Sequence, residues 1–264
     1  MSDINVSADA LKKFLKVDCN IKIFDILEST NITAKNDAKN GAAEGTLIIA
    51  RSQLGGKGRL GRSFYSPKNS GIYFSLVLKP NIPPKDITLI TPTAAVAVAL
   101  AIETVANKNP KIKWVNDIFV NGKKVCGILS EAAFNSDGTA AQYIILGIGI
   151  NLTTPKGGFP EDIKNIAGSV YEENETPYIN KLIAEVINNF FEFYNELNSP
   201  TLPLEYQNRM MLIGDNINYT HNGIQKSGIV MRIDERFRLI IKKENGDLIH
   251  LESGEVTIHS KNII

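Results

Sequence analysis

One segment of the sequence can form only a loop, and its side chains suit an anion. Residues 53–62 contain four glycines and three cations, and no acidic residue lies among them. A segment this rich in glycine contributes little to a core, whereas its backbone N–H groups and its Lys and Arg side chains can close around an anion. We therefore predict a phosphate-binding loop here. A solvated basic loop, or a patch for nucleic acid, is the alternative.

The overall charge favours the first interpretation. Within 264 residues, 29 Lys and Arg nearly balance 28 Asp and Glu, which leaves a net charge of +1. Proteins that bind nucleic acid generally carry a clear basic excess, so we expect no DNA binding. A hydrophobic content of 43% is enough for a full-sized core and a small additional domain.

Targeting and redox signals are weak in this sequence. The N-terminus is polar from Ser2 onward, so we predict neither a secretory signal nor a membrane anchor. The expected location is the cytoplasm, where Cys19 and Cys126 would be reduced packing residues. The three histidines lie near the C-terminus without ligand-like spacing, which argues against a transition-metal site or a histidine-dependent triad.

Hydrophobic periodicity predicts strands followed or preceded by separate helices, an arrangement typical of an α+β fold with helices packed on a mixed or antiparallel sheet. After residue 211 the pattern changes to short alternating strands, which predict a small β-barrel. We expect two domains, residues 1–211 and 212–264. The predicted helices are 8–15, 88–105 and 179–197. The predicted strands are 21–26, 46–50, 71–78, 112–114, 117–120, 125–132, 143–152, 228–232, 239–243 and 248–251.

Two lysines lie on one face of the strand that runs toward Trp114. Strict alternation places Lys111 and Lys113 together, with Ile112 and Trp114 toward the core. Solvated lysines are the ordinary explanation for such a pair. Asn116 and Asp117 follow and could form a simple turn, but a carboxylate beside a cationic pocket is also what a phosphate-bound magnesium ion needs. Asp117 is therefore our candidate metal ligand.

Glycines recur in two later strands where a side chain would be expected. Gly127 follows Lys124 by three residues, and Gly147 and Gly149 share one face of the strand that ends at Asn151. Glycine weakens a strand unless something approaches the backbone closely, so a flat ligand could lie on this face. Close packing of a helix is the alternative, and Lys124 could merely extend along the sheet edge.

Taken in order, these motifs resemble the biotin protein ligases. The resemblance rests on the loop with residues 63–67, on Lys113 to Asp117, on Lys124 to Leu129 and on Gly147 to Asn151. It covers about residues 29–169, and residues 254–256 resemble the C-terminal barrel of the family. It implies a fold like the class II synthetases and biotin ligases with an SH3-like barrel. The chain resembles the short class without an N-terminal DNA-binding domain.

The resemblance implies a function. Biotin would be activated with ATP and Mg²⁺ to biotinyl-5′-AMP, then transferred to a lysine of the biotin carboxyl carrier domain of a biotin-dependent carboxylase, a post-translational modification. An edge strand of the sheet could pair with another copy, which would give a homodimer, or with the acceptor protein. The alternatives are a lipoate or octanoyl ligase, a non-catalytic biotin-binding protein and a nucleic-acid-binding module.

The resemblance also assigns site residues. The implied catalytic residues are Arg59, Lys113 and Lys124. The implied biotin-binding residues are Ser29, Thr30, Asn31, Gln53, Lys57, Gly58, Arg59, Lys124, Gly127, Gly147 and Gly149. The implied ATP or adenylate contacts are Arg59, Arg62, Phe64, Lys113, Asn116, Asp117 and Asn151.

The sequence departs from the family pattern in four segments. Lys57 stands where Arg is usual, Phe64 where Trp is common, Val115 where Pro is common, and Met231 and Arg232 stand where a glycine usually precedes an Ile-Asp pair. Lys57 keeps the charge but loses a planar bidentate fork. Ser29, Thr30 and Asn31 could also act only as helix N-caps.

Overall fold

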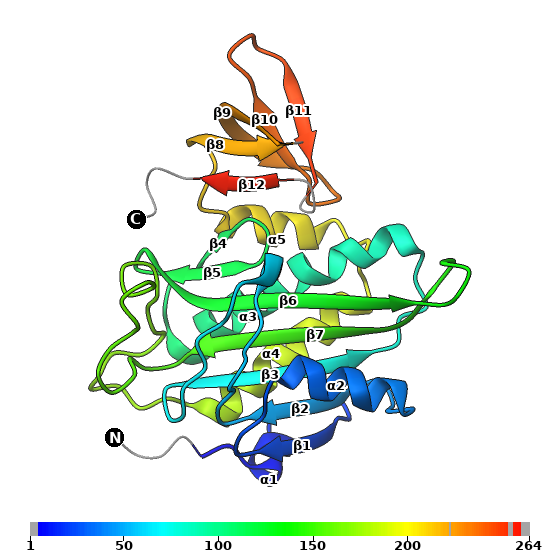
Figure 1. Ribbon diagram of the computed structural model, residues 1–264, viewed down its shortest axis with the longest axis vertical. Helices are drawn as coiled ribbons and strands as arrows, with labels where there is room; N and C mark the ends of the chain where they lie inside the picture. Colours follow the sequence, from blue (N-terminus) through cyan, green and yellow to red (C-terminus); the bar gives the residue numbers. More distant parts are fainter. Residues whose placement is uncertain (1–4, 222, 253–255, 260–264) are drawn as a thin grey trace.

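The computed structural model describes residues 5–221, 223–252 and 256–259, and these form two sheets with helices around the larger one. Figure 1 shows the large sheet with α2 in front of it and α3 and α4 behind it, while the small sheet of β8 to β12 lies beyond α5. This arrangement confirms the α+β fold class.

The large sheet has seven strands in the order β1-β2-β3-β7-β6-β5-β4. Its first pair, β1 and β2, is parallel, and the other neighbours are antiparallel, so the sheet is mixed. The strands are β1 (Asn20–Phe24), β2 (Thr46–Ala50), β3 (Gly71–Leu78), β4 (Lys111–Lys113), β5 (Asp117–Val120), β6 (Lys123–Phe134) and β7 (Ala141–Asn151).

The central strands are buried on both faces because helices cover both. All residues of β2 and β3 are buried, and both strands read as continuous runs of mostly apolar residues rather than as alternating patterns. Such runs are typical of strands that lie between two helical layers. The register pairs Tyr73 with Gly149 and Ser75 with Gly147, which places β3 side by side with the glycine-bearing strand.

Helix α3 (Ile90–Ala106) is the principal core helix, as its alanine-rich sequence predicts. Together with the 3₁₀ turn η2 (Pro84–Leu89) it forms an apolar segment long enough to cross a membrane, but 72% of its most apolar window is buried inside the fold. Helix α4 (Ile179–Tyr194) packs beside it. On the other face lies α2 (Thr30–Lys39), and α1 (Ala8–Lys12) is near β1.

One helix and two strands differ from expectation, and one of these strands is β12 (Val256–His259), which was not among the predicted strands. Helix α5 (Thr201–Arg209) was missed because Pro200 and Pro203 suggested only a helix exit. Proline is tolerated in the first turn of a helix, where the N–H group has no intrahelical partner, and Pro203 occupies that turn. Strand β8 (Asn216–His221) was also missed, because its polar residues obscure the alternation of the buried Ile217 and Tyr219.

The C-terminal part forms an antiparallel five-stranded sheet in the order β11-β10-β9-β8-β12. The other strands are β9 (Ile224–Ile233), β10 (Leu239–Lys242), β11 (Leu248–Leu251) and β12 (Val256–His259). Residues 254 and 255 of the barrel motif lie outside the described residues. The small sheet is consistent with an SH3-like domain.

The turn between β9 and β10 joins the small sheet to the large one. The Trp114 indole Nε1 donates a buried 2.8 Å hydrogen bond to the carbonyl oxygen of Phe237, whose ring packs edge-on against Tyr206 of α5. Arg236 forms a 3.1 Å ion pair with Asp86 and donates a second hydrogen bond to the Lys85 carbonyl at 2.6 Å. The two sheets therefore contact each other through side chains as well as through α5.

Replacing Arg236 with alanine tests this junction. The Asp86 side chain is only 8% exposed, so losing its cation leaves a buried carboxylate without its ion pair. We expect Arg236→Ala to lower the free energy of unfolding by about 1–3 kcal/mol, measured by urea denaturation. Lys242→Ala, at an exposed position of β10, is the control. Equal stability of the two variants would contradict this role of Arg236.

Candidate functional site

The glycine-rich loop is held at both ends by backbone hydrogen bonds. Gln53 N–H donates to the Ser66 carbonyl at 3.0 Å, and Phe64 N–H donates to the Gly56 carbonyl at 2.8 Å. At the tip, Gly58 N–H donates to the Arg62 carbonyl at 2.7 Å. The loop thus folds back on itself like a narrow hairpin, with Lys57 and Ser63 opposite each other.

Glycine is required at two points of this loop for steric reasons. A Cβ atom at Gly56 would lie 2.4 Å from the Phe64 carbonyl oxygen, so the two arms of the loop could not approach each other. Gly61 has a φ of +74°, a conformation that residues with side chains rarely adopt. Leu60 takes a positive φ of 55° beside it and is 73% exposed.

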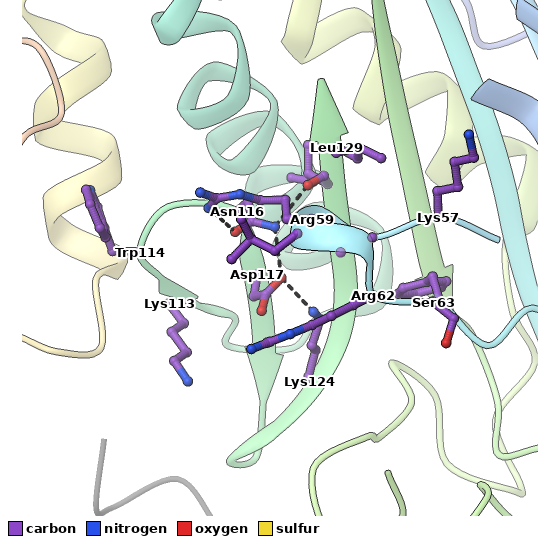
Figure 2. Close-up of a pocket in the computed structure, with 15 residues that line it drawn as sticks. Lys57, Arg59, Arg62, Ser63, Lys113, Trp114, Asn116, Asp117, Lys124 and Leu129 are labelled. Carbon is purple, nitrogen blue, oxygen red and sulfur yellow. Dashed lines mark hydrogen bonds and ion pairs between the residues drawn. The ribbon is translucent and has the colours of Figure 1, made fainter. Parts of the chain in front are cut away.

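The loop covers a cavity of about 210 Å³ between itself and strands β4, β5 and β6. Figure 2 shows cationic side chains around this cavity, with Arg59 directed at Asn116 and Lys124 at Asp117. The cavity, which we call the cationic cavity, is lined by Lys57, Gly58, Arg59, Leu60, Arg62, Ser63, Phe64, Lys113, Trp114, Asn116, Asp117, Lys124, Gly127, Ile128 and Leu129.

Five cationic side chains and one carboxylate line the cationic cavity, so the net charge of its lining is strongly positive. Lys124 Nζ is 2.7 Å from Asp117 Oδ1, and both side chains are mostly buried. Burial lowers the pKa of Lys113, and the Asp117 carboxylate opposes that shift. Burial likewise lowers the pKa of Arg59. Removing these cations from water is unfavourable without a counter-anion, so the cavity is prepared for an anionic ligand.

Asn116 connects the loop to the strands beneath it. Its Oδ1 accepts from Arg59 Nη1 at 3.0 Å, and its Nδ2 donates to the Ile128 carbonyl at 2.9 Å and to Asp117 Oδ1 at 3.1 Å. Arg59 is therefore oriented by a side chain that is itself held by the sheet. Such restraint reduces the entropy lost when the guanidinium binds an anion.

The residues that could hold a metal are few. Among the described residues, no group of three or more His, Cys, Asp or Glu side chains could hold a metal ion. Asp117 is the single carboxylate that lines the cationic cavity, and its Oδ1 is already close to Lys124. The donor set therefore does not fit a metal bound by the protein alone, although one carboxylate suits a magnesium ion that arrives with a polyphosphate.

A second, smaller cavity adjoins the first and is uncharged except for Lys57 at its border. It measures about 20 Å³, roughly enough for one water molecule. The two cavities share Lys57, Phe64, Gly127 and Leu129. This polar cavity is lined by Ser29, Thr30, Asn31, Gln53, Lys57, Phe64, Gly127, Leu129, Gly147, Ile148 and Gly149.

The start of α2 provides one wall of the polar cavity. Ser29 occupies the N-cap position but its side chain makes no capping hydrogen bond. Instead the Thr30 N–H donates to Gln53 Oε1 at 2.8 Å, so a side chain of the loop satisfies the helix N-terminus. The three polar residues at positions 29–31 are buried and line the cavity, rather than serving only as caps.

The glycine face of the sheet is partly covered by the protein itself. A Cβ atom at Gly147 would lie 2.0 Å from Asn31 Oδ1, and one at Gly149 would lie 2.5 Å from the Phe64 ring, which also covers Gly127. These glycines thus allow Asn31 and Phe64 to approach the backbone. The expectation of a fully bare floor is wrong in this respect, because a polar amide and an aromatic ring occupy part of it.

Most residues chosen from the sequence line one of the two cavities, and one does not. Asn151 lies outside both linings, and its amide donates to the Gly168 carbonyl at 3.0 Å. Its proposed contact with adenine has no support from this geometry. Conversely, the cationic cavity is also lined by residues that had not been chosen: Leu60, Ser63, Trp114, Ile128 and Leu129. All five lie within the quoted motifs, so position within a motif was the available signal.

Buried Tyr206 is a further neighbour that sequence reasoning missed. Its side chain is completely buried, its hydroxyl has no hydrogen-bond partner among the described residues, and both Asp117 and Arg59 influence its pKa. Burial raises that pKa well above the usual value. The hydroxyl is therefore neutral, and it lies close enough to Asp117 and Arg59 to be affected by their charges. No motif marks this position, because α5 itself was not expected.

Comparison with known proteins relates this geometry to a family. Residues 23–151 match the model of the biotin/lipoate A/B protein ligase family. The bifunctional ligase/repressor BirA of Bacillus subtilis is 43% identical over 146 residues, which cover 55% of this chain and 44% of that protein. A biotin–[acetyl-CoA-carboxylase] ligase of Mycobacterium tuberculosis is 26% identical over 237 residues, 84% of this chain and 86% of that protein.

Solved structures have the same fold. A biotin protein ligase from Aquifex aeolicus, in complex with biotin and ATP, superposes with a TM-score of 0.74 at 24% identity and covers 92% of this chain and 99% of that one. One from Leishmania major, in complex with biotinyl-5-AMP, has a TM-score of 0.59 at 19% identity over 90% of this chain and all of that one. The chain spans less than half of the length of the Bacillus relative.

Inorganic pyrophosphate provides a simple probe of the cationic cavity. We expect it to bind, and Lys113→Ala to weaken binding about tenfold, because one charge-assisted hydrogen bond contributes roughly 1.5–3 kcal/mol. The matched control is Lys111→Ala, an exposed lysine on the same strand outside the cavity. Isothermal titration calorimetry measures both. Equal affinity of the two variants would remove Lys113 from the anion site.

Proposed function

We propose that this chain, whose residues 23–151 belong to the biotin/lipoate A/B protein ligase family, is an ATP-dependent biotin protein ligase. It activates biotin as biotinyl-5′-AMP and transfers the biotin to a lysine of an acceptor protein. The observation that carries the proposal is the contact between a strongly cationic cavity and a polar uncharged one beneath the same loop.

In the first step a biotin carboxylate oxygen attacks the α-phosphorus of ATP, and the bond from that phosphorus to the leaving pyrophosphate oxygen breaks. The products are the mixed anhydride and pyrophosphate. The physical difficulty is to bring one anion to a polyanion. Lys57 lines both cavities and, with Arg59 and Lys124 of the cationic cavity, can neutralise both groups, while Lys113 and Arg62 in the same lining can contact the phosphates. Each charge-assisted contact that strengthens at the transition state lowers the barrier.

In the second step the acceptor amine attacks the carbonyl carbon of the anhydride, an amide bond forms and AMP leaves. The amine must first lose a proton. Asp117 is the single carboxylate that lines the cationic cavity, and it can receive that proton only by weakening its pairing with Lys124. The anhydride must also be kept from water, and the loop of residues 53–62 is placed to cover it.

The names of the relatives support the choice of acceptor and substrate. The Mycobacterium relative, which aligns along most of this chain, is named as a ligase of biotin and acetyl-CoA carboxylase. A biotin carboxyl carrier domain of such a carboxylase is therefore the proposed partner. The family model also includes lipoate ligases, but a competition measurement with biotin and lipoate distinguishes the two activities.

Magnesium enters this proposal with the nucleotide. Mg²⁺ is commonly held by one or two carboxylates together with substrate phosphates, and Asp117 can supply one such contact. The ion would neutralise charge on the polyphosphate, while the chain's own cations orient it. We also place this activity in the cytoplasm, where ATP is available and where free Cys19 and Cys126 would remain reduced. The near-zero net charge supports the expectation that the chain does not bind DNA.

Pyrophosphate exchange tests the first step directly. The purified chain should incorporate labelled pyrophosphate into ATP only when biotin is present. We expect Lys124→Ala to slow exchange about 100-fold or more, because it removes a cation that lines the cationic cavity and leaves Asp117 without its ion pair. Lys181→Ala, exposed on α4, is the control. A loss below about threefold would remove Lys124 from the catalytic residues.

An open strand edge supports a homodimer. Strand β6 pairs with β7 as far as Phe134, but its pairing with β5 ends at Gly127. Ile128 N–H donates to the Asn116 carbonyl, so by alternation the backbone groups of Ser130 and Ala132 point to the same outer edge. No strand among the described residues covers this edge. Two copies could pair there in an antiparallel manner.

Ala132→Pro tests the dimer because it removes an outward N–H group at an exposed position. The variant should sediment as a monomer under conditions in which the unchanged chain, with biotin and MgATP, forms dimers, and it should keep biotin-dependent exchange. Ala132→Ser retains the N–H group and should still dimerise. If Ala132→Pro dimerises equally well, the interface lies elsewhere. If neither protein dimerises, the open edge serves another purpose.

A further inference from the structure

A chain of hydrogen bonds leads from the polar cavity to a carboxylate outside it. Asn31 Nδ2 donates to Glu131 Oε2 at 2.7 Å, and Asn31 Oδ1 lies 2.6 Å from Ser75 Oγ. Ser75 Oγ lies 2.8 Å from Thr30 Oγ1, which in turn lies 3.1 Å from Gln53 Oε1. Thr30, Asn31 and Gln53 line the polar cavity, whereas Ser75 and Glu131 do not.

This series of hydrogen bonds has one hydrogen fewer than its contacts need. Three oxygen–oxygen contacts, Gln53–Thr30, Thr30–Ser75 and Ser75–Asn31, need one hydrogen each. The two hydroxyl groups supply only two, because each carries a single hydrogen. The carboxylate of Glu131 can only accept, so it holds the Asn31 amide with its NH₂ group outward and its oxygen toward Ser75. Ser75 must therefore donate to Asn31.

The shortage appears at the wall of the polar cavity. With its own hydrogen committed to Asn31, Ser75 can only accept from Thr30. The single hydroxyl hydrogen of Thr30 can go to Gln53 Oε1 or to Ser75 Oγ, but not to both. Thr30 Oγ1 receives no hydrogen in either case, while Gln53 Oε1 always keeps the bond from the Thr30 backbone N–H. The Thr30 hydroxyl oxygen is thus an acceptor without a donor at the cavity wall, and an unmatched buried acceptor is unfavourable.

We infer that Glu131 is a positioning residue that selects a ligand with N–H donors by setting the direction of this hydrogen-bond chain. The inference rests on the proposed function and deepens it. Biotin carries a cyclic urea with two N–H groups, either of which can donate to Thr30 Oγ1. A dithiolane ring such as that of lipoate has no donor and would leave this oxygen unmatched. The wall therefore favours the urea because the urea supplies the hydrogen that an acceptor oxygen of the wall lacks, and not through shape alone.

Replacing Glu131 with glutamine reverses the direction of the hydrogen bonds that run from residue 131 to Gln53. The amide introduced by Glu131→Gln can donate to Asn31 Oδ1, which allows the Asn31 amide to turn over and donate to Ser75. Ser75 can then donate to Thr30, and Thr30 to Gln53. Every contact now has a hydrogen, so the wall no longer needs a donor from the ligand. The ligand-free protein should become more stable while the affinity for a urea falls.

The experiment measures both quantities for Glu131→Gln. Calorimetric titration with biotin and with dethiobiotin, which keeps the urea but lacks the sulfur, should show an affinity loss of about tenfold for each, which corresponds to about 1.4 kcal/mol. The Tm of the ligand-free variant should rise by about 2–4 °C. Glu192→Gln, the same change at an exposed position of α4, should alter neither quantity.

A purely structural role for Glu131 would have a different signature. Affinity and Tm would then fall together, and that result would overturn the inference, as would a biotin affinity that stays within twofold of the unchanged chain. Ser75→Ala provides a second variant, because it interrupts the chain between Asn31 and Thr30. In the Ser75→Ala background, Glu131→Gln should change biotin affinity less than twofold. A full tenfold effect there would contradict coupling through Ser75.

Failure of the proposed function would be recognised separately. A chain that does not recognise biotin would bind neither biotin nor dethiobiotin before any substitution, and one that binds biotin without activating it would show no biotin-dependent pyrophosphate exchange. The Tm of ligand-free Glu131→Gln needs no ligand and still tests the hydrogen count. If biotin binds and the Tm of this variant does not rise, the proposed function stands and the account of Glu131 is wrong.

Discussion

The structure depends on holding like charges close together in a partly dehydrated cavity. Arg59, Lys113 and Lys124 are each partly buried there, and Asp117 is the single carboxylate in the lining. Their mutual repulsion and lost hydration would expel flexible side chains into water. The fold prevents this in two ways: Asn116 anchors Arg59 to the sheet, and backbone hydrogen bonds close the loop that carries it. The stability of the core thus offsets the repulsion between these cations, and the arrangement becomes favourable when an anion enters.

The same loop relates the cationic cavity to the polar one. Gln53, at its start, satisfies the N-terminus of α2 with Oε1 and donates to Ser66 Oγ with Nε2. Phe64, near its end, lies on Gly127 and Gly149. A movement of this loop would therefore alter the charge, the acceptor wall and the aromatic floor together. This coupling offers a physical basis for making a reactive intermediate only when both ligands are present.

The small C-terminal sheet contributes to this region through one turn. The carbonyl of Phe237 accepts from Trp114, which lines the cationic cavity between Lys113 and the Asn116 anchor. The Phe237 ring packs on Tyr206, whose neutral hydroxyl lies close enough to Arg59 and Asp117 to be affected by their charges. The small sheet is therefore in physical contact with the residues that support the anion site, although it contributes none of the cavity lining.

Local interactions decided what could be predicted from the sequence alone. Alternating and continuous apolar runs established the strands, the alanine-rich segment established α3, and the four motifs identified nearly all of the cavity lining, because each motif is a short segment with its own strand or turn geometry. Contacts between distant residues could not be predicted. Asn31 and Glu131 are 100 positions apart, and Trp114 and Phe237 are 123 apart. Whether Asn31 caps a helix or orients a ligand wall, and whether a glycine face stays bare, depends on which side chains the folded chain brings there, and packing of the whole molecule determines that.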